Sequence, residues 1–469
     1  MTALSIDTSV KACTSSYTFC FYVSGHGWGH ATRANQIITD ILNLPAKHKV
    51  YVVSNASDFI FQGVIKIGAI YRQADIDAGV VQPLAYTVDR QQTIQNLRLF
   101  LERRQETLAA EVAWLKQVEA DCVICDAPFL PCAAAGRAGI PAIIASNFTF
   151  DEVYRGLCEG DDLDQEILDM VEKTIEDYRN ADLLVRLPGA IRIPSFDNAE
   201  TLVPVTPISA TFAERQKGVV NGKMQLPCTS LANVATSKRQ VRPIERRIVD
   251  VPLVFRKHHR EREEVLNELG IPKEIYDSHK ILLLSFGGQA LGKGGWVDPL
   301  PPGWICIVCC APEGVTLPRN FYRASRDAYV PDLTNAADVV LGKLGYGTCS
   351  ECIGHGTPFV YVPRPQFIEE YGLLKLMQDQ GSAVELSQKD FEAGYWGEAI
   401  EKASQLLGRC EEPERLVGHN GGQVAASTIE SFVSEWQQHY KQLDQVVEET
   451  MVETNDDAIS RTISAESSA

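Results

Sequence analysis

The sequence predicts an α/β protein with two parallel-sheet domains. Short apolar runs alternate with amphipathic stretches along most of the 469 residues, and a stretch without clear periodicity separates two such halves. Short buried strands that alternate with helices are typical of a mostly parallel sheet with helices on both faces. A chain of this length also exceeds the usual size of one domain. We therefore expect two α/β domains joined by a linker.

The first half contains apolar runs of strand length and longer amphipathic runs of helix length. Strands are expected at Thr18–Ser24, Lys49–Ser54, Cys122–Cys125 and Ala142–Ala145, and helices at Thr32–Leu42 and Gln91–Val118. In the longer helix, apolar residues recur at spacings of three, four and seven, which indicates one buried face.

The same alternation resumes after Val251. Strands are expected at Ile281–Phe286, Trp304–Cys310, Asp338–Leu341 and Phe359–Val362. Helices are expected at Glu261–Leu269, Gly347–Gly354, Glu370–Asp379 and about Gln423–His439. The predicted segments are a disordered N-terminus 1–17, an N-terminal domain 18–206, an irregular linker or insertion 207–247, a C-terminal domain 248–410, a helical region 411–441 and an acidic disordered tail 442–469.

Charge and hydropathy exclude some classes of function. The formal net charge is -17, which argues against a nucleic-acid partner because phosphates must be met by clustered Lys and Arg. No secretory signal and no apolar run of about 18 residues is visible, so we expect a cytoplasmic protein without an integral membrane segment.

Three CxxC pairs raise the question of a metal site. They are Cys122/Cys125, Cys306/Cys309 and Cys349/Cys352. The first two lie in apolar runs, where positions i and i+3 of a strand point to opposite faces and cannot hold one ion together. We interpret these cysteines as small buried residues and expect no metal.

A glycine-rich loop follows the first strand and opens the first helix, with the sequence SGHGWGHATR from Ser24 to Arg33. Gly27 and Gly29 let the backbone approach a ligand, and the N–H groups of a helix N-terminus suit a phosphate. The loop does not fit the GxGxxG fingerprint of dinucleotide-binding folds, because His30 stands where the third glycine would be. The loop therefore predicts a phosphate or anion site of another kind.

Two histidines in this loop are candidate functional residues. His30 lies where α/β ligands bind and is expected to act as a general base, while His26 is either functional or only a packing residue. Asp126 ends a neighbouring strand and either orients His30 or caps the following helix.

The second half contains two more glycine turns. Gly287 and Gly288 follow a strand, and the run from Asp338 to Glu351 places further candidate donor-binding residues at a helix start: Lys343, Gly345, Gly347, Thr348 and Glu351. Glu351 is placed to accept ribose hydroxyls, and Glu369 and Glu370 to hold sugar hydroxyls. The alternatives are helix capping for Thr348 and exposed first-turn carboxylates for Glu369 and Glu370.

These motifs together resemble GT-B glycosyltransferases, the group that includes plant and macrolide UDP-sugar transferases and the bacterial lipid-linked N-acetylglucosamine transferase. They are most similar to the glycosyltransferase-like N-terminal region of L-arabinokinases. The resemblance covers about residues 18–410 and rests on YVSGHGWGHATR, DAPFLPCAAAGRAGIPAIIASNFTFDEVY, DVPLVFRKHHREREEVLNELGI and DVVLGKLGYGTCSECIGHGTPFVYVPR.

The resemblance implies a GT-B fold, in which two Rossmann-like domains face each other across a cleft. It implies that His30 deprotonates the acceptor, that Glu351 contacts the ribose, and that the diphosphate is contacted by Gly287, Gly288, Gly347 and Thr348. Glu369 and Glu370 replace the Asp-Gln pair of plant transferases. Only about 30 residues follow the last predicted helix, so we expect no kinase domain.

The expected function is metal-independent, inverting transfer of a sugar from a nucleoside diphosphate sugar, expected to be a UDP-sugar, to a small-molecule hydroxyl. The nucleotide sugar is a co-substrate, and no other cofactor is expected. His26 and Trp28 are expected on the acceptor side, with Ala74–Val88 and Val153–Ile193 as acceptor loops. The alternatives are a nucleotide-sugar epimerase and a non-catalytic nucleotide-sugar-binding or scaffold protein.

Overall fold

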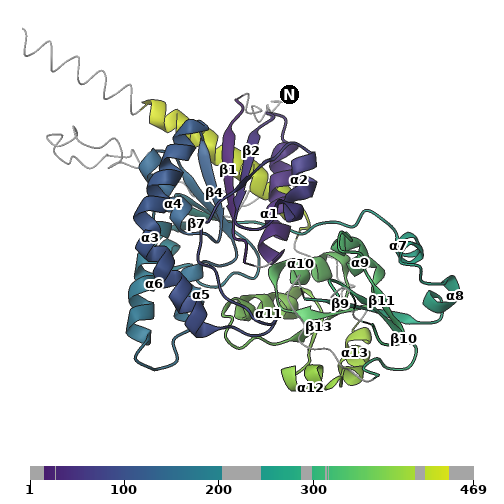
Figure 1. The fold of residues 1–469 in the computed structure, drawn as a ribbon. Coiled ribbons are helices and arrows are strands. Elements are labelled where there is room, and N and C mark those ends of the chain that lie inside the picture. Colours follow the sequence, from purple (N-terminus) through teal and green to yellow (C-terminus); the bar gives the residue numbers. More distant parts are fainter. Residues whose placement is uncertain are drawn as a thin grey trace, which may run out of the picture.

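The computed structural model describes residues 15–26, 28–202, 244–286, 298–311, 314, 316–406 and 418–442. Two parallel sheets with helices around them form two domains, one above the other in Figure 1. Some predicted features lie outside the described residues: Gly27, Gly287, Gly288, most of the N-terminus 1–17, most of the linker 207–247 and the tail from 443 onward.

The first sheet has the strand order β3-β2-β1-β4-β5-β6-β8-β7, and its neighbouring strands are parallel. Its strands are β1 Thr18–Val23, β2 Lys49–Ser54, β3 Ile70–Gln73, β4 Cys122–Asp126, β5 Ala142–Ser146, β6 Leu183–Arg186, β7 Glu200–Leu202 and β8 Arg247–Asp250. The helical segments of this half are α1 Trp28–Leu42, η1 Asp58–Phe61, α2 Gln62–Lys66, α3 Arg90–Gln117, α4 Leu130–Ala138, α5 Phe150–Arg155, α6 Asp164–Tyr178 and η2 Pro194–Phe196.

The second sheet has the strand order β11-β10-β9-β12-β13-β14 and is also parallel. Its strands are β9 Lys280–Ser285, β10 Trp304–Val308, β11 Phe321–Arg323, β12 Val339–Lys343, β13 Phe359–Val362 and β14 Ala383–Glu385. The helices of this half are α7 Arg262–Glu268, α8 Lys273–Tyr276, α9 Val330–Ala336, α10 Tyr346–His355, α11 Glu369–Gln380, α12 Gln388–Ala393, α13 Gly397–Ser404 and a final helix over 421–442.

The predicted strands and helices are confirmed within a few residues, because their apolar patterns match the burial. In β1, five of six residues are buried, as expected for a strand paired on both sides and covered on both faces. In α3, the Asp89 side chain accepts from the Gln92 N–H and caps the helix, and Ile94, Leu97 and Leu108 are buried.

The cysteines of the CxxC pairs are buried, as expected. Cys122 packs with Phe19 on one face of the first sheet, and Cys125 packs with Leu130 on the other face. The interpretation that this pair points to opposite faces is therefore confirmed. Among the described residues, no group of three or more His, Cys, Asp or Glu side chains is arranged to hold a metal ion.

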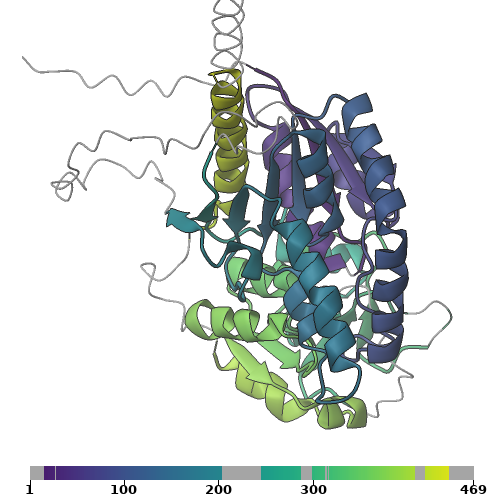
Figure 2. The ribbon, with the colours of Figure 1, turned by 90° about the vertical axis from the view of Figure 1, so that its left-hand side faces the viewer.

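Two segments outside the predicted N-terminal domain pack with the first domain. The predicted second domain begins at 248, yet β8 adds Arg247–Asp250 to the first sheet. The final helix also returns to the first domain, where Glu430 and Glu435 form ion pairs with His48 at 2.9 Å and with Arg247. Figures 1 and 2 show this helix, in yellow, beside the first sheet.

The prediction of acceptor loops over Val153–Ile193 is wrong for most of its length. This region holds α6 and β6, whose Ile167, Ile175 and Leu184 are buried in the core of the first domain. In α6, Ile167, Val171 and Ile175 are buried at spacings of four, which is the pattern of a helix packed on a core and not of a loop. Within the described part of the chain, no helix combines the length and apolar character needed to cross a bilayer.

Candidate active site

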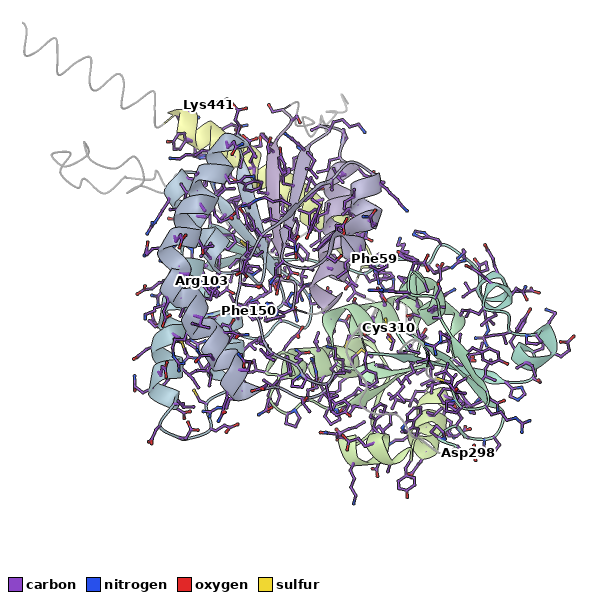
Figure 3. The ribbon with its side chains drawn as sticks, viewed as in Figure 1. Phe59, Arg103, Phe150, Asp298, Cys310 and Lys441 are labelled. Carbon is purple, nitrogen blue, oxygen red and sulfur yellow. The ribbon has the colours of Figure 1, made fainter. Side chains whose placement is uncertain are left out.

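A cavity lies where the two domains meet, at the carboxyl ends of the parallel strands. Ligands of parallel α/β sheets bind at such edges. The first domain lines it with His26, Gly29, His30, Arg33, Val80, Gln82, Phe148, Phe150 and Val153. The second domain lines it with Lys343, Gly345, Tyr346, Gly347, Thr348, Arg364, Phe367 and Glu369. Phe150, labelled in Figure 3, lies on the part of the first domain that faces the second.

The structure brings the predicted base and its partner together. His30 lies in the first turn of α1 and Asp126 at the end of β4, and these neighbouring elements place His30 Nδ1 3.3 Å from Asp126 Oδ2. Both side chains are buried. The alternative role of Asp126 as a helix cap is not supported, because the N-cap of α4 is Phe129 and has no side-chain cap bond. The geometry suits a carboxylate that orients an imidazole.

Arg33 is a site residue that the sequence interpretation missed. Its Nε donates to Asp126 Oδ1 at 2.8 Å, and its Nη2 lies 3.2 Å from His30 Nδ1. Burial acts to raise the pKa of Asp126, but the charge of Arg33 and the contact with His30 outweigh it and lower that pKa. Its spacing of three from His30 on one helix face could have revealed this residue.

The second histidine has a carboxylate partner of its own. His26 Nε2 lies 3.1 Å from Asp77 Oδ1, and Asp77 is fully buried. Burial lowers the pKa of His26, but the hydrogen bond and the charge of Asp77 raise it by more than burial lowers it. The net shift of the pKa is therefore upward. The ring packs against Gly79, whose φ is +57° and where a Cβ would meet the imidazole at 1.9 Å. His26 is therefore held in a fixed place at the cavity.

The structure describes the other residues of the glycine loop only in part. Trp28 begins α1, and its side chain is not among those described. Gly29 lines the cavity, as expected for a residue that lets a ligand come close to the backbone. Gly27 lies outside the described residues.

The start of α10 forms the opposite wall of the cavity. Gly345 is the N-cap, and Gly347 and Thr348 lie in the first turn and line the cavity. A Cβ at Gly347 would meet Thr32 Oγ1 of α1 at 2.5 Å, so only glycine allows the two domains to approach this closely. The N-terminal N–H groups of this helix therefore face the side of His30 and suit an anion.

Lys343 adds a cationic group to this wall. It ends β12 and lines the cavity. Burial, followed by the charge of Arg364, lowers the pKa of Lys343 to about 7. The amine can therefore gain a proton when an anion binds near neutral pH.

The two predicted sugar-binding carboxylates have different hydrogen-bond partners and different positions relative to the cavity. Glu369 lines the cavity and accepts from Asn147 Nδ2 at 3.2 Å, which joins the two domains. Glu370 instead accepts from the backbone N–H of Arg364 at 2.8 Å and does not line the cavity. Both are buried, so the alternative of exposed first-turn carboxylates is wrong. Of the two, Glu369 is the one that lines the cavity.

Glu351 is not placed at the cavity in this structure. It is buried in α10 and bound to Arg256, with 2.9 Å between Arg256 Nε and Glu351 Oε1. Burial raises the pKa of Glu351, and the charge of Arg256 opposes this only in part. The sequence placed the carboxylate in the helix but gave no sign of a partner 95 residues away.

Residues 74–89, here called the strap, run from β3 to α3 of the first domain and pack against the second domain. Val80 and Gln82 line the cavity, which agrees with the expected position of Ala74–Val88 beside it. Farther along, Tyr86 is buried in the second domain, where its ring packs edge-on to Phe286 at 6.5 Å and Phe391 at 5.8 Å. The strap is therefore a wall of the cavity and also an anchor between the domains.

Comparison with known proteins gives a consistent result. No protein-family model matches the chain. It is 33% identical to the L-arabinokinase of Arabidopsis thaliana over 426 residues, which are 90% of this chain and 35% of that protein. The chain thus spans about a third of the length of this relative.

Two solved glycosyltransferases are similar in structure to this chain, and the first of them shows the fold. The calicheamicin glycosyltransferase CalG4 is 16% identical, with 89% of this chain and 98% of that chain covered and a TM-score of 0.53. MurG of Acinetobacter baumannii is 13% identical, with 88% and 99% covered and a TM-score of 0.47. The chain has the GT-B fold, with two Rossmann-like domains, and the resemblance inferred from its motifs is confirmed.

Proposed function

We propose that this chain transfers a sugar from a nucleoside diphosphate sugar to a hydroxyl of a small acceptor, with inversion at the anomeric carbon. The observation that carries the proposal is the pairing of His30 with Asp126 in a cavity whose facing wall contains the start of α10. A base on one side and an anion-binding helix end on the other are what displacement of a diphosphate requires.

The proposed step begins at His30. When its Nδ1–H donates to Asp126, the Nε2 lone pair is free to take the proton of the acceptor hydroxyl. The hydroxyl oxygen forms a bond to the anomeric carbon as the bond to the diphosphate oxygen breaks. A single displacement of this kind inverts the anomeric centre.

The leaving diphosphate gains negative charge during this step. The N–H groups at the start of α10 and the ammonium of Lys343 are assigned to stabilise it. These groups supply positive charge without a resident metal, and we therefore propose a metal-independent reaction. Glu369 is assigned to the sugar hydroxyls, and the wall formed by His26 and the strap to the acceptor. A UDP-sugar donor and a cytoplasmic location remain predictions from the sequence.

The first experiment is a calorimetric titration with UDP, TDP, GDP and ADP, followed by an acceptor screen with the matching nucleotide sugar. His30→Gln should keep nucleotide affinity and lose turnover by at least about 100-fold, the usual range for loss of a general base. His439→Gln is the control, because that side chain is exposed on the final helix. Binding of none of the four nucleotides would refute the donor assignment.

A non-catalytic nucleotide-sugar-binding protein is the second candidate. It is favoured by the ion pair that Glu351 forms with Arg256, which leaves this carboxylate away from the cavity. In that case nucleotide sugars bind but His30→Gln changes no reaction. An epimerase would instead convert the donor without any acceptor.

The named relative suggests one further assay. Because the chain matches an L-arabinokinase over 35% of that protein, ATP and L-arabinose should be included in the screen. Formation of a sugar phosphate by this chain would point to kinase activity in place of the proposed sugar transfer.

A further inference from the structure

Arg33 occupies the point where the two domains meet behind the candidate base. Its guanidinium carbon lies 5.3 Å from the ring centre of Phe148 in the first domain and 5.4 Å from that of Tyr346 in the second. The side chain is 2% exposed, so it depends on protein groups rather than water for its hydrogen bonds.

The hydrogen-bond partners of Arg33 form a chain across the domain contact. Nε and Nη2 donate to Asp126 Oδ1, Nη2 also donates to Ser146 Oγ at 3.0 Å, and Nη1 donates to Asn147 Oδ1. The amide of Asn147 then donates to Glu369 Oε1 at 3.2 Å. The carboxylate that orients the base is thus connected to the carboxylate on the donor side.

His30 Nδ1 has two possible partners with opposite requirements. It lies 3.3 Å from Asp126 Oδ2, which needs a proton on Nδ1, and 3.2 Å from Arg33 Nη2, which needs a bare Nδ1 because a guanidinium only donates. The first arrangement leaves Nε2 free to act as a base. The second places the proton on Nε2 and turns His30 into a donor.

The contacts of Arg33 decide between these arrangements. Nη2 carries two hydrogens, and Asp126 Oδ1 and Ser146 Oγ take both. No hydrogen of Nη2 is then left for His30, so the imidazole must give its own Nδ1 hydrogen to Asp126 Oδ2. The Nδ1–H form of His30 is kept only while Asn147 binds Arg33 Nη1 and prevents the guanidinium from turning.

We propose that Arg33 is a positioning residue that sets the tautomer of His30, and that Asn147 and Glu369 hold it in place when the domains are closed. The base would then be ready only when the donor-side carboxylate is in position. The catalytic consequence of this inference rests on the proposed function. The tautomer of His30 itself can be measured without any turnover.

The test uses the full chain with ¹⁵N-labelled histidine and long-range ¹H–¹⁵N spectra, which distinguish the two tautomers. His30→Gln assigns the signal by its loss. The unchanged protein should show the Nδ1–H form of His30. Asn147→Ala should show the Nε2–H form, because Arg33 Nη1 then loses its acceptor. Asn147→Asp should keep the Nδ1–H form, because its carboxylate still accepts from Arg33 Nη1.

Gln366→Ala is the matched control. The Gln366 side chain also donates across the domain contact, to Glu159 at 3.4 Å, but does not touch Arg33 or Asn147. It should leave the His30 tautomer unchanged. The proposal is overturned if a folded Asn147→Ala protein keeps the Nδ1–H form, or if the unchanged protein already has the Nε2–H form.

A kinetic readout separates this idea from the proposed function. If the chain is a transferase, Asn147→Ala should lower kcat by about 10- to 100-fold, the size expected for one hydrogen bond to a charged group, with a smaller change in the donor KM. An unchanged kcat would overturn the proposal. If the unchanged protein has no turnover at all, the proposed function fails, and the tautomer measurement still decides the role of Arg33.

Discussion

Replacing Glu351 by alanine tests whether this carboxylate serves the fold or a bound ribose. The Glu351 side chain is 4% exposed and that of Arg256 is 19% exposed, so the substitution leaves a largely buried guanidinium without its partner. Removing one member of a buried ion pair costs about 3–5 kcal/mol. Arg256 retains some exposure and a contact with the Tyr329 ring at 5.3 Å, so we expect the lower end, about 3 kcal/mol.

The assay is urea unfolding with and without UDP, combined with calorimetric titration of the folded protein. Glu351→Gln is the control, because its amide oxygen can still accept from Arg256 and no carboxylate has to be buried. We expect it to change the free energy of unfolding by less than about 1.5 kcal/mol, the usual worth of one hydrogen bond. Arg256→Met combined with Glu351→Ala should recover part of the loss, since the uncompensated charge is gone.

The opposite result would refute this reasoning. If Glu351→Ala leaves the free energy of unfolding within about 0.5 kcal/mol of the original value and abolishes UDP binding, the ion pair is not structural and the ribose role is correct. If both stability and binding fall, UDP binding to Glu351→Gln decides, because the amide keeps the fold but accepts fewer hydroxyls than a carboxylate.

Three further predictions follow from the cavity and its walls. Tyr86→Ala should destabilise the strap by about 3 kcal/mol and speed its proteolysis. Tyr86→Phe should cost much less, because the ring that packs with Phe391 remains and only the hydroxyl contact with Glu392 is lost. Because the pKa of Lys343 is about 7, its ammonium is lost between pH 7 and pH 9, and diphosphate affinity should fall at least about fivefold over this range. Lys343→Met should remove this pH dependence. A flat affinity profile in the original protein would contradict the assignment of Lys343 to the diphosphate. Asp77→Asn should lower the pKa of His26 in an NMR titration, because burial then acts without the opposing carboxylate; an unchanged value would show that another group raises it.

The sequence by itself determined the two-sheet architecture and the general location of the site. Both depend on local information: apolar periodicity reports which faces are buried, and glycines after a strand mark the edge where ligands bind. This is why β1, α3 and the start of α10 agree with their predicted ranges. The approach of Asp126 to His30 was also predictable, because neighbouring parallel strands end at the same edge.

Only the tertiary structure decided which charged groups meet. Arg33 contacts Asp126 from 93 residues away, and Arg256 takes up Glu351 across 95 residues. Periodicity cannot reveal such pairs, because a polar residue looks the same whether it faces water or a buried partner. The sequence indicated the final helix and the position of the strap beside the cavity, but not that Tyr86 of the strap packs in the second domain or that the final helix packs on the first. These long-range pairs therefore set which carboxylates remain free to act.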